Sequence, residues 1–171
     1  MLKFFGSLLI ITGCGGIAYS KMCGCRKRIE LLDALERMTN KGIYILLGQQ
    51  QNTVIFLKNV SCGNKAFDAE LSRMGEALER HLYPNGDLAW RAGPASFMGQ
   101  YGFRREDLEL INGCGAAFFE KSSDEIRNSL ETNLKLIELI REQELSSQRE
   151  IKKVWLPVSL MGGIACVLVF A

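Results

Sequence analysis

Six cysteines and one histidine are the residues of this chain best suited to metal or redox chemistry. Cys23 and Cys25 form a C-x-C pair, whereas Cys62 and Cys114 stand apart from it in the sequence. Zinc sites favour two pairs of ligands with two to four residues between the members, so this spacing argues against zinc. The single histidine, His81, ends an amphipathic segment, and we interpret it as a surface or capping residue because metal binding and catalysis need partners. We therefore expect no metal and no cofactor.

The remaining sequence offers little for catalysis. It contains no phosphate-binding loop, nucleophile elbow or serine–histidine pairing. The carboxylates alternate with Lys and Arg along helical patterns, which is typical of solvated surface. We predict that the chain is not an enzyme. A membrane-tethered enzyme or thiol sensor is a rival hypothesis, and it requires the four interior cysteines to converge in the fold. The net charge of +2 gives no reason to expect nucleic acid as a partner.

Two apolar runs frame the chain. Residues 4–20 read FFGSLLIITGCGGIAYS and residues 154–171 read VWLPVSLMGGIACVLVFA, and neither run contains a charged side chain. A helix needs roughly 17–25 predominantly apolar residues to cross a bilayer. We therefore predict transmembrane helices at 1–21 and 154–171, with an interior domain at 22–153.

Small residues in these runs allow helices to approach closely in lipid. The candidates for such packing, within this chain or with a partner, are Gly13, Ser159, Gly162 and Gly163.

Cations cluster on the interior side of both runs. They are Lys21, Arg26, Lys27 and Arg28 after the first run, and Arg149, Lys152 and Lys153 before the second. Lys and Arg near membrane spans remain on the cytoplasmic side. This distribution predicts a cytoplasmic interior domain with both termini on the opposite side of the membrane.

The first run also supports a different hypothesis. Ile11-Thr12-Gly13-Cys14 has the form of a lipoprotein box, in which a cysteine follows an aliphatic and two small residues and is lipidated after export. A lipoprotein would carry the interior domain outside the cell as a membrane-anchored binding module. We prefer the spanning helix, because the apolar run continues past Cys14 and dense positive charge then opposes export.

The interior domain is expected to be a helical bundle, so that the fold class is all-α with two long terminal helices continuing into the spans. Helices are predicted at 26–47, 53–60, 64–82, 105–119 and from Ser122 into the second run. A short apolar piece is expected to begin at Trp90 and to end at Gly93-Pro94. Gly48 is a predicted helix stop, and Asn52 or Thr53 a predicted cap.

Two helices carry clear apolar stripes. The stripe of the segment 64–82 comprises Phe67, Leu71, Met74, Leu78 and Leu82. The last helix should open with a capping box at Ser122–Glu125. Its stripe comprises Ile126, Leu130, Leu134, Ile137, Leu139 or Ile140, and Leu145.

The chain resembles the stage III sporulation protein AB family of endospore-forming bacteria. The stretches that carry the resemblance are MLKFFGSLLIITG, RKRIELLDALERM, GDLAW ending at Trp90, FRREDLELI, and the segment from SSDEIRNSL to SLMGGI. The chain departs from the family pattern at FFEKSSD, where Leu-Gly is usual before Ser-Asp, and at Asn128, where glutamine is usual.

The resemblance implies a role in sporulation, in the mother-cell membrane that engulfs the forespore. There the family belongs to a secretion-like channel, and its cytoplasmic domain is similar to that of the type II secretion and type IV pilus platform protein. The implied partners are the sporulation AA-type ATPase, other membrane subunits of the channel and the lipid bilayer. Candidate partner-facing residues are Arg73, Arg80, Arg104 and Arg105, for which a solvated surface is the alternative.

Overall fold

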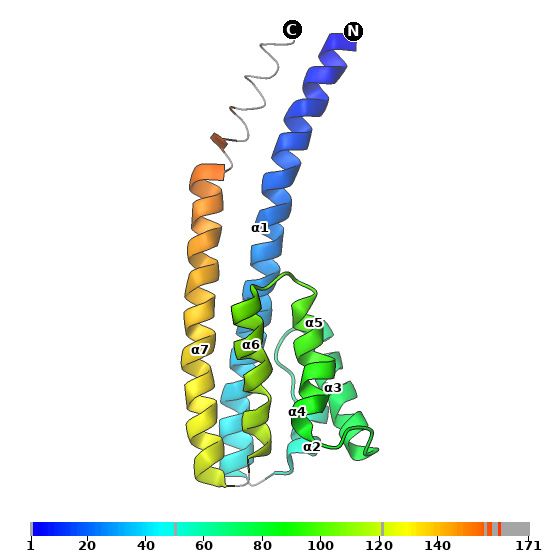
Figure 1. Cartoon of the computed structure of the whole chain (residues 1–171), viewed down its shortest axis with the longest axis vertical. Helices are drawn as coiled ribbons and strands as arrows, with labels where there is room; N and C mark the ends of the chain where they lie inside the picture. The colour runs from blue at the N-terminus through cyan, green and yellow to red at the C-terminus, as the bar shows by residue number, and fades with distance from the viewer. Residues whose placement is uncertain (1, 50, 121, 156, 159–160, 162–171) are drawn as a thin grey trace. The chain divides into compact units, whose positions relative to one another are not determined.

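The structure is a computed structural model. It describes the backbone of residues 2–49, 51–120, 122–155, 157–158 and 161, and the side chains of residues 16, 19–49, 51–120, 122–154, 157–158 and 161. Every regular element in these ranges is a helix, which confirms the predicted all-α class (Figure 1). Contacts divide the chain into two compact units, which we describe separately: unit 1 comprises Met1–Lys27 and Gln143–Ala171, and unit 2 comprises Arg28–Glu142.

The elements follow in this order: α1 (Leu2–Gly42), η1 (Ile43–Gly48), α2 (Thr53–Asn59), α3 (Lys65–Glu79), α4 (Gly86–Trp90), η2 (Arg91–Ala95), α5 (Ser96–Gly99), α6 (Arg105–Cys114), η3 (Ala116–Phe119), α7 (Ser123–Glu150) and η4 (Ile151–Trp155). The segments η1, η2 and η4 are π-helical, and η3 is a 3₁₀ turn.

The part of α1 in unit 2 provides one wall of its core. Leu32, Leu35 and Met38 recur at spacings of three and are fully buried, which places them on one helical face. The helical path continues through η1 and ends at Gly48, as predicted. Gly42 lies so close to the ring of Phe118 that a Cβ there would overlap it.

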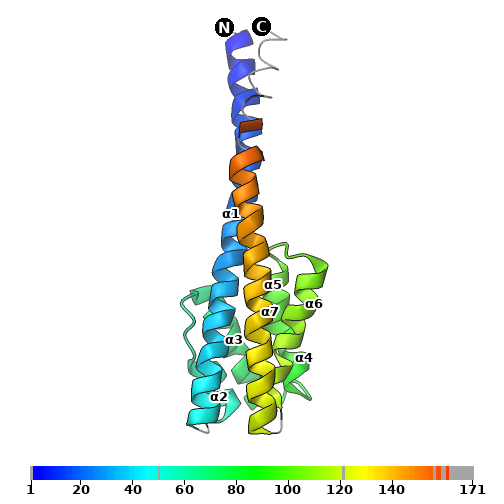
Figure 2. The ribbon, with the colours of Figure 1, turned by 90° about the vertical axis from the view of Figure 1, so that its left-hand side faces the viewer.

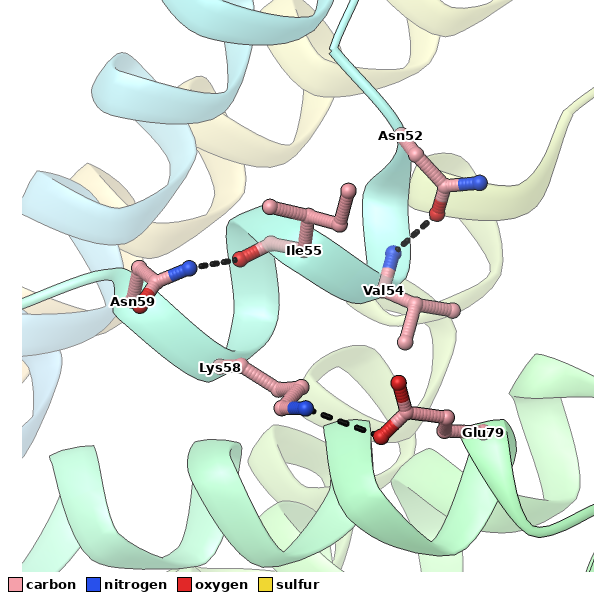
Figure 3. Close-up of polar contacts among 6 residues, drawn as sticks. All are labelled: Asn52, Val54, Ile55, Lys58, Asn59 and Glu79. Atoms are coloured by element: carbon pink, nitrogen blue, oxygen red, sulfur yellow. Dashed lines mark hydrogen bonds and ion pairs between the residues drawn. The ribbon is translucent and has the colours of Figure 1, made fainter.

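Three successive helices begin at asparagine caps. The side-chain oxygen of Asn52 accepts from Val54 N at 2.8 Å at the start of α2, and the predicted short helix is confirmed there. Figure 3 shows this cap and the ion pair of Lys58 with Glu79, 2.8 Å long, which joins α2 to the end of α3. Asn64 caps α3 and Asn85 caps α4 in the same way. Each bond satisfies an N–H group that the first helical turn leaves without a partner.

The expectation that the chain breaks at Gly93-Pro94 is wrong. Trp90 ends α4 instead of opening an element, and helical turns continue without a gap from Gly86 through η2 to Gly99. Pro94 is buried inside the π-helical turn η2. Proline lacks the N–H that an α-helical turn would use, and a locally wider turn accommodates the ring and the lost bond.

The predicted stripe on α3 is confirmed except at its last member. Phe67, Leu71 and Met74 are buried, but Leu82 lies beyond the helix end and is 66% exposed. The helix stops at His81, the one non-glycine residue with a positive φ (55°) in the described ranges. Leu82 N donates to Ala77 O at 2.9 Å and His81 N to Leu78 O at 3.0 Å, the bond pair of a Schellman motif. His81 is exposed and caps the helix end, as predicted.

The helix α7 packs its apolar stripe against the rest of unit 2. Leu130, Ile137 and Ile140 are buried, whereas Leu139 is 49% exposed, so Ile140 is the stripe member at that turn. Glu125 accepts from Ser122 N at 3.3 Å, which confirms the glutamate half of the capping box. Figures 1 and 2 both show α7 beside the unit 2 part of α1.

No helix among the described residues is long and apolar enough to cross a membrane. The structure does not describe the side chains of residues 2–15, 17 and 18, and residues 156, 159–160 and 162–171 lie outside the description altogether. Of the predicted packing residues, Ser159, Gly162 and Gly163 lie outside the described residues, and Gly13 falls where side chains are not described. The two spans and the boundaries at 21 and 154 stay predictions.

Candidate partner-binding surface

Unit 2 has two distinct ends. At the exit end the chain leaves toward unit 1: Arg141 pairs with Asp33 at 2.7 Å, and Arg28 Nη1 donates to Tyr101 O at 3.4 Å. The unbroken helical run from Gly86 to Gly99 leads away from this end, since Gly99 lies just before Tyr101. At about 1.5 Å per residue this run spans roughly 20 Å. The start of α4 therefore marks the opposite end, which we call the far end.

Side chains of η3 hold the far end together. Thr53 Oγ1 donates to Phe118 O at 3.2 Å, and the rings of Phe56 and Phe118 stack with centroids 6.0 Å apart. The ring of Phe119 covers the backbone of Gly86, where a Cβ would overlap it. These contacts pack η3 against the starts of α2 and α4.

The Gly-Asp-x-x-Trp stretch is the packing element behind these contacts. Trp90 is fully buried, and its Nε1 donates to Ile111 O at 2.9 Å. Its ring lies directly over Gly115, where a Cβ would overlap the indole. Gly86 makes room for Phe119, and Asp87 pairs with Arg91 at 3.0 Å. These residues fix α4 against α6 and η3.

Large apolar side chains gather in the elements of the far end. Tyr44 in η1 is 70% exposed, Ile55 in α2 is 48% exposed, and Leu88 in α4 is 45% exposed. Leu82 lies in the loop that leads into α4. In unit 2 the other large apolar side chain with comparable exposure is Leu139, which lies roughly 24 Å along α7 from Ser123. Exposed apolar side chains at one end of a domain are candidates for an interaction site.

Two grooves of unit 2 share Ala116 and Glu120 in their linings. The first holds about 390 Å³ and is lined by Asp87, Glu120 and Glu125, together with Asn85, Gly86, Ala116 and Phe119. The second holds about 280 Å³ and is lined mainly by polar side chains: Asn128, Ser129, Thr132 and Asn133. Neither groove is lined by a Lys or Arg of the described residues. Their carboxylates suit a partner with basic side chains.

One carboxylate oxygen of the first groove has no hydrogen-bond donor among the described residues. Asp87 Oδ2 pairs with Arg91, whereas Oδ1 is buried and accepts no hydrogen bond from these residues. A buried acceptor without a donor costs free energy.

A third groove of about 310 Å³ lies between η1 and α2. Its lining includes Tyr44, Ile45, Phe56 and Val60, with Lys41 at the edge. Lys41 Nζ donates to Ser61 O at 2.6 Å, so its ammonium is bound to the backbone after α2. The far-end surface therefore combines apolar and acidic regions.

The four arginines predicted to face a partner do not lie together. Arg80 follows α3 near the far end, while Arg104 and Arg105 begin α6 at the exit end, next to Gly102, whose carbonyl accepts from Arg28. Arg73 is exposed and pairs with Glu70 at 2.7 Å, and Arg105 pairs with Glu109 at 3.5 Å. All four are exposed. Their role in partner binding stays a prediction.

Two of the interior cysteines, Cys62 and Cys114, are buried thiols with raised pKa values. Burial, followed by the nearby Asp68 carboxylate, raises the pKa of Cys62 from 9.0 to about 12. Burial alone raises the pKa of Cys114 to about 12. Reactive thiols have a depressed pKa instead. In the part of the chain that was described, no three His, Cys, Asp or Glu side chains gather as a metal site would require.

Sequence patterns did not reveal the far-end surface. Leu88 and Tyr44 look like ordinary apolar positions of helices, and Asp87, Glu120 and Glu125 belong to three separate segments. They meet only because Phe118 and Phe119 bring η3 against α2 and α4. The one local signal was FFEKSSD, which contains Phe119 and Glu120.

Comparison with known families gives one match, which covers nearly the whole chain. The model of stage III sporulation protein AB matches residues 3–171. No curated protein and no solved structure shows significant similarity. The matched range includes both apolar runs, all of unit 2 and the Gly-Asp-x-x-Trp stretch. The chain belongs to the stage III sporulation protein AB family.

Proposed function

We propose that this protein is a non-enzymatic membrane platform of the sporulation channel. The two apolar runs anchor it in the mother-cell membrane around the forespore, and unit 2 lies in the cytoplasm. There it docks the sporulation AA-type ATPase and links it to the membrane subunits. The observation that carries this proposal is the far-end surface, which exposes apolar and acidic side chains at the end of unit 2 opposite the chain exits.

The position of the far-end surface supports docking of a soluble partner. Both connections to unit 1, at Arg28 and Glu142, leave from the exit end. The exposed apolar side chains of unit 2 lie mostly at the other end, where a partner in the cytoplasm has access. Buried aromatic and aliphatic anchors with a polar rim are typical of protein interfaces.

The charge of the chain supports the anchored arrangement. Residues 28–142 carry 14 Lys and Arg against 17 Asp and Glu, a net charge of −3. The remainder carries 7 against 2, a net charge of +5. Positive charge is thus concentrated next to the apolar runs, which is the distribution expected of a cytoplasmic membrane boundary.

The positions at which the chain differs from the family pattern also support the far end as the docking surface. FFEKSSD contributes Phe119 and Glu120 to the first groove, and Asn128 lines the second. Both departures therefore lie on the proposed docking surface, which is expected where each chain matches its own partner.

Capture of the purified ATPase by the full chain in lipid nanodiscs tests the docking. Leu88→Ser should weaken capture by roughly tenfold or more, because truncation of an anchor residue costs about 1–2 kcal/mol or more. Leu139→Ser is the matched control, since Leu139 is as exposed but lies toward the exit end. Its capture should equal that of the unchanged chain.

Equal losses in the two leucine variants, or no capture by the unchanged chain, would contradict the docking surface. The same variants should be tested in sporulating cells. Cells with Leu88→Ser should grow normally and stall after engulfment, whereas cells with Leu139→Ser should form spores. A growth defect in vegetative cells would contradict the sporulation role.

A further inference from the structure

Exposed cations concentrate in the described part of unit 1. They are Lys21, Arg26, Lys27, Arg149, Lys152 and Lys153, which we call the basic collar. Of the two acidic residues in unit 1, Glu144 is 4% exposed and Glu150 is exposed. Positive charge therefore exceeds negative charge in unit 1, with seven Lys and Arg against two acidic residues.

In both segments of the collar, exposed apolar side chains follow the cations on the side of the apolar run. In the C-terminal segment, Lys153 is followed by Val154, Val158 and Met161, which are 50%, 59% and 71% exposed. In the N-terminal segment, Tyr19 is 64% exposed and precedes Lys21 on the side of the apolar run. Exposed apolar side chains thus begin where the cations end, in two segments far apart in sequence.

This order matches the boundary between hydrocarbon and headgroups. The exposed valine and methionine side chains lose unfavourable contact with water when they enter the acyl region. Lys and Arg extend their charged ends to the headgroup level while their methylene stems remain in apolar surroundings. Tyrosine is enriched at the same depth. A soluble polyanion would neutralise the cations but would leave the apolar side chains in water.

The spacing within the C-terminal segment concentrates the charge over a short stretch. Arg149, Lys152 and Lys153 lie within five consecutive residues at the junction of α7 and η4. Three cations so close together create a local positive potential that a phosphodiester can neutralise, and arginine can bind its oxygens through two parallel N–H groups.

We propose that the basic collar binds the phosphate groups of anionic phospholipids in the leaflet that faces unit 2. This inference rests on the proposed membrane anchoring and adds a lipid class to it. Each cation close to an anionic leaflet strengthens the association by about fivefold. The three cations of Arg149, Lys152 and Lys153 together account for a difference of roughly 100-fold.

Binding of fluorescent phosphatidylglycerol to the full chain in neutral detergent micelles tests this proposal. Fluorescent phosphatidylcholine is the lipid control. The triple variant Arg149→Gln, Lys152→Gln, Lys153→Gln should lose most of its preference for phosphatidylglycerol over phosphatidylcholine, because three charge-assisted contacts to the phosphate are removed. A matched variant, Lys65→Gln, Arg127→Gln, Lys135→Gln, removes the same charge from exposed positions of unit 2 and should bind both lipids as the unchanged chain does.

Three results would overturn the proposal. One is equal affinity of the unchanged chain for the two lipids. Another is an equal loss in both triple variants, which would assign the effect to net charge. A third is full competition by inorganic phosphate, which would indicate a site for free phosphate. ATPase capture is measured separately, so docking can succeed while lipid selectivity fails, and the two proposals are distinguishable.

Discussion

At the scale of single residues, contacts between glycines and aromatic rings determine how closely the elements of unit 2 pack. Trp90 and Gly115 form the tightest of these contacts, and the indole N–H satisfies Ile111 O inside the core. The ring, its hydrogen bond and the missing Cβ act together, because the ring can reach Ile111 only if residue 115 carries no side chain. The Gly-Asp-x-x-Trp stretch is therefore a packing motif.

Gly115→Ala should lower the free energy of unfolding by about 1–3 kcal/mol, because the added methyl overlaps the indole in a filled core. Gly113→Ala is the matched control two residues earlier, where no atom lies within 4 Å of the position of a Cβ. It should leave stability unchanged or raise it by up to about 1 kcal/mol. Urea unfolding of both variants measures the difference. Equal stability would contradict the packing role of Gly115.

His81 adopts an unfavourable backbone conformation at the end of α3, because a positive φ is disfavoured for non-glycine residues. His81→Gly should raise the free energy of unfolding by about 1 kcal/mol. His81→Ala keeps a Cβ at this position and should give no such gain. Thermal unfolding compares the two variants, and a gain with alanine as large as with glycine would rule out the backbone explanation.

The buried thiols give stability a pH dependence. The pKa of Cys62 and that of Cys114 are each about 12 in the folded state, whereas the ordinary pKa of a cysteine thiol is 9.0. The unfolded chain therefore loses these protons first, so the free energy of unfolding should fall as pH rises above about 9. Below that pH the folded and unfolded chains both keep these protons, so the thiols do not make the free energy of unfolding depend on pH.

The double variant Cys62→Ala, Cys114→Ala is the control for this pH dependence. It should be less stable at neutral pH because it leaves cavities, but its stability should fall less steeply above pH 9 than that of the unchanged chain. Chemical unfolding at several alkaline pH values measures both slopes. Identical slopes would contradict the assignment to these thiols.

At the scale of elements, asparagine caps fix where the short helices begin. Asn52, Asn64 and Asn85 each accept a backbone N–H at 2.8–3.1 Å. Such caps matter most for α2 and α4, which are too short to be stable without their surroundings. They also place the chain reversals that form the far end.

Asn64→Ala should cost about 1 kcal/mol of unfolding free energy, because Phe67 N would lose its acceptor. Asn64→Asp keeps an acceptor in the same place and should retain most of the stability. Thermal unfolding of the two variants is the measurement. A loss in the aspartate variant equal to that in the alanine variant would show that the cap bond is not the cause.

Periodicity and caps predicted most elements of unit 2, because both are local properties. The helix starts at Thr53, Lys65, Arg105 and Ser123 fall within a residue or so of the predicted positions. The exceptions depend on tertiary contacts. Pro94 did not end the helix, since burial and the π-helical turn keep the chain helical there. Leu82 and Leu139 fit their apolar stripes, yet both are exposed.

The candidate docking surface could not be predicted in the same way. Its carboxylates come from α4, from the segment after η3 and from α7. Charge along one helix gives no information about neighbours on another. The predicted arginines show the same limit, since their exposure was foreseeable but their separation between the two ends of unit 2 was not.

At the scale of the whole molecule, we propose that one unit anchors the chain and the other binds the partner. Unit 1 combines a charge of +5 with the apolar runs, and unit 2 combines a charge of −3 with the far-end surface. This division is the central claim, because both the ATPase docking and the lipid selectivity require unit 2 to lie in the cytoplasm.

Labelling with a membrane-impermeant maleimide tests that claim most directly. The probe position is Arg73→Cys, whose side chain is 73% exposed in unit 2. The chain should also carry Cys23→Ser and Cys166→Ser, and the same chain without Arg73→Cys is the control for the cysteines that remain. The chain is produced in cells that are not sporulating, where its membrane is the plasma membrane, and we predict labelling only after these cells are lysed. Labelling in intact protoplasts would place unit 2 outside the cell, and it would favour the lipoprotein hypothesis for Cys14 over the cytoplasmic platform.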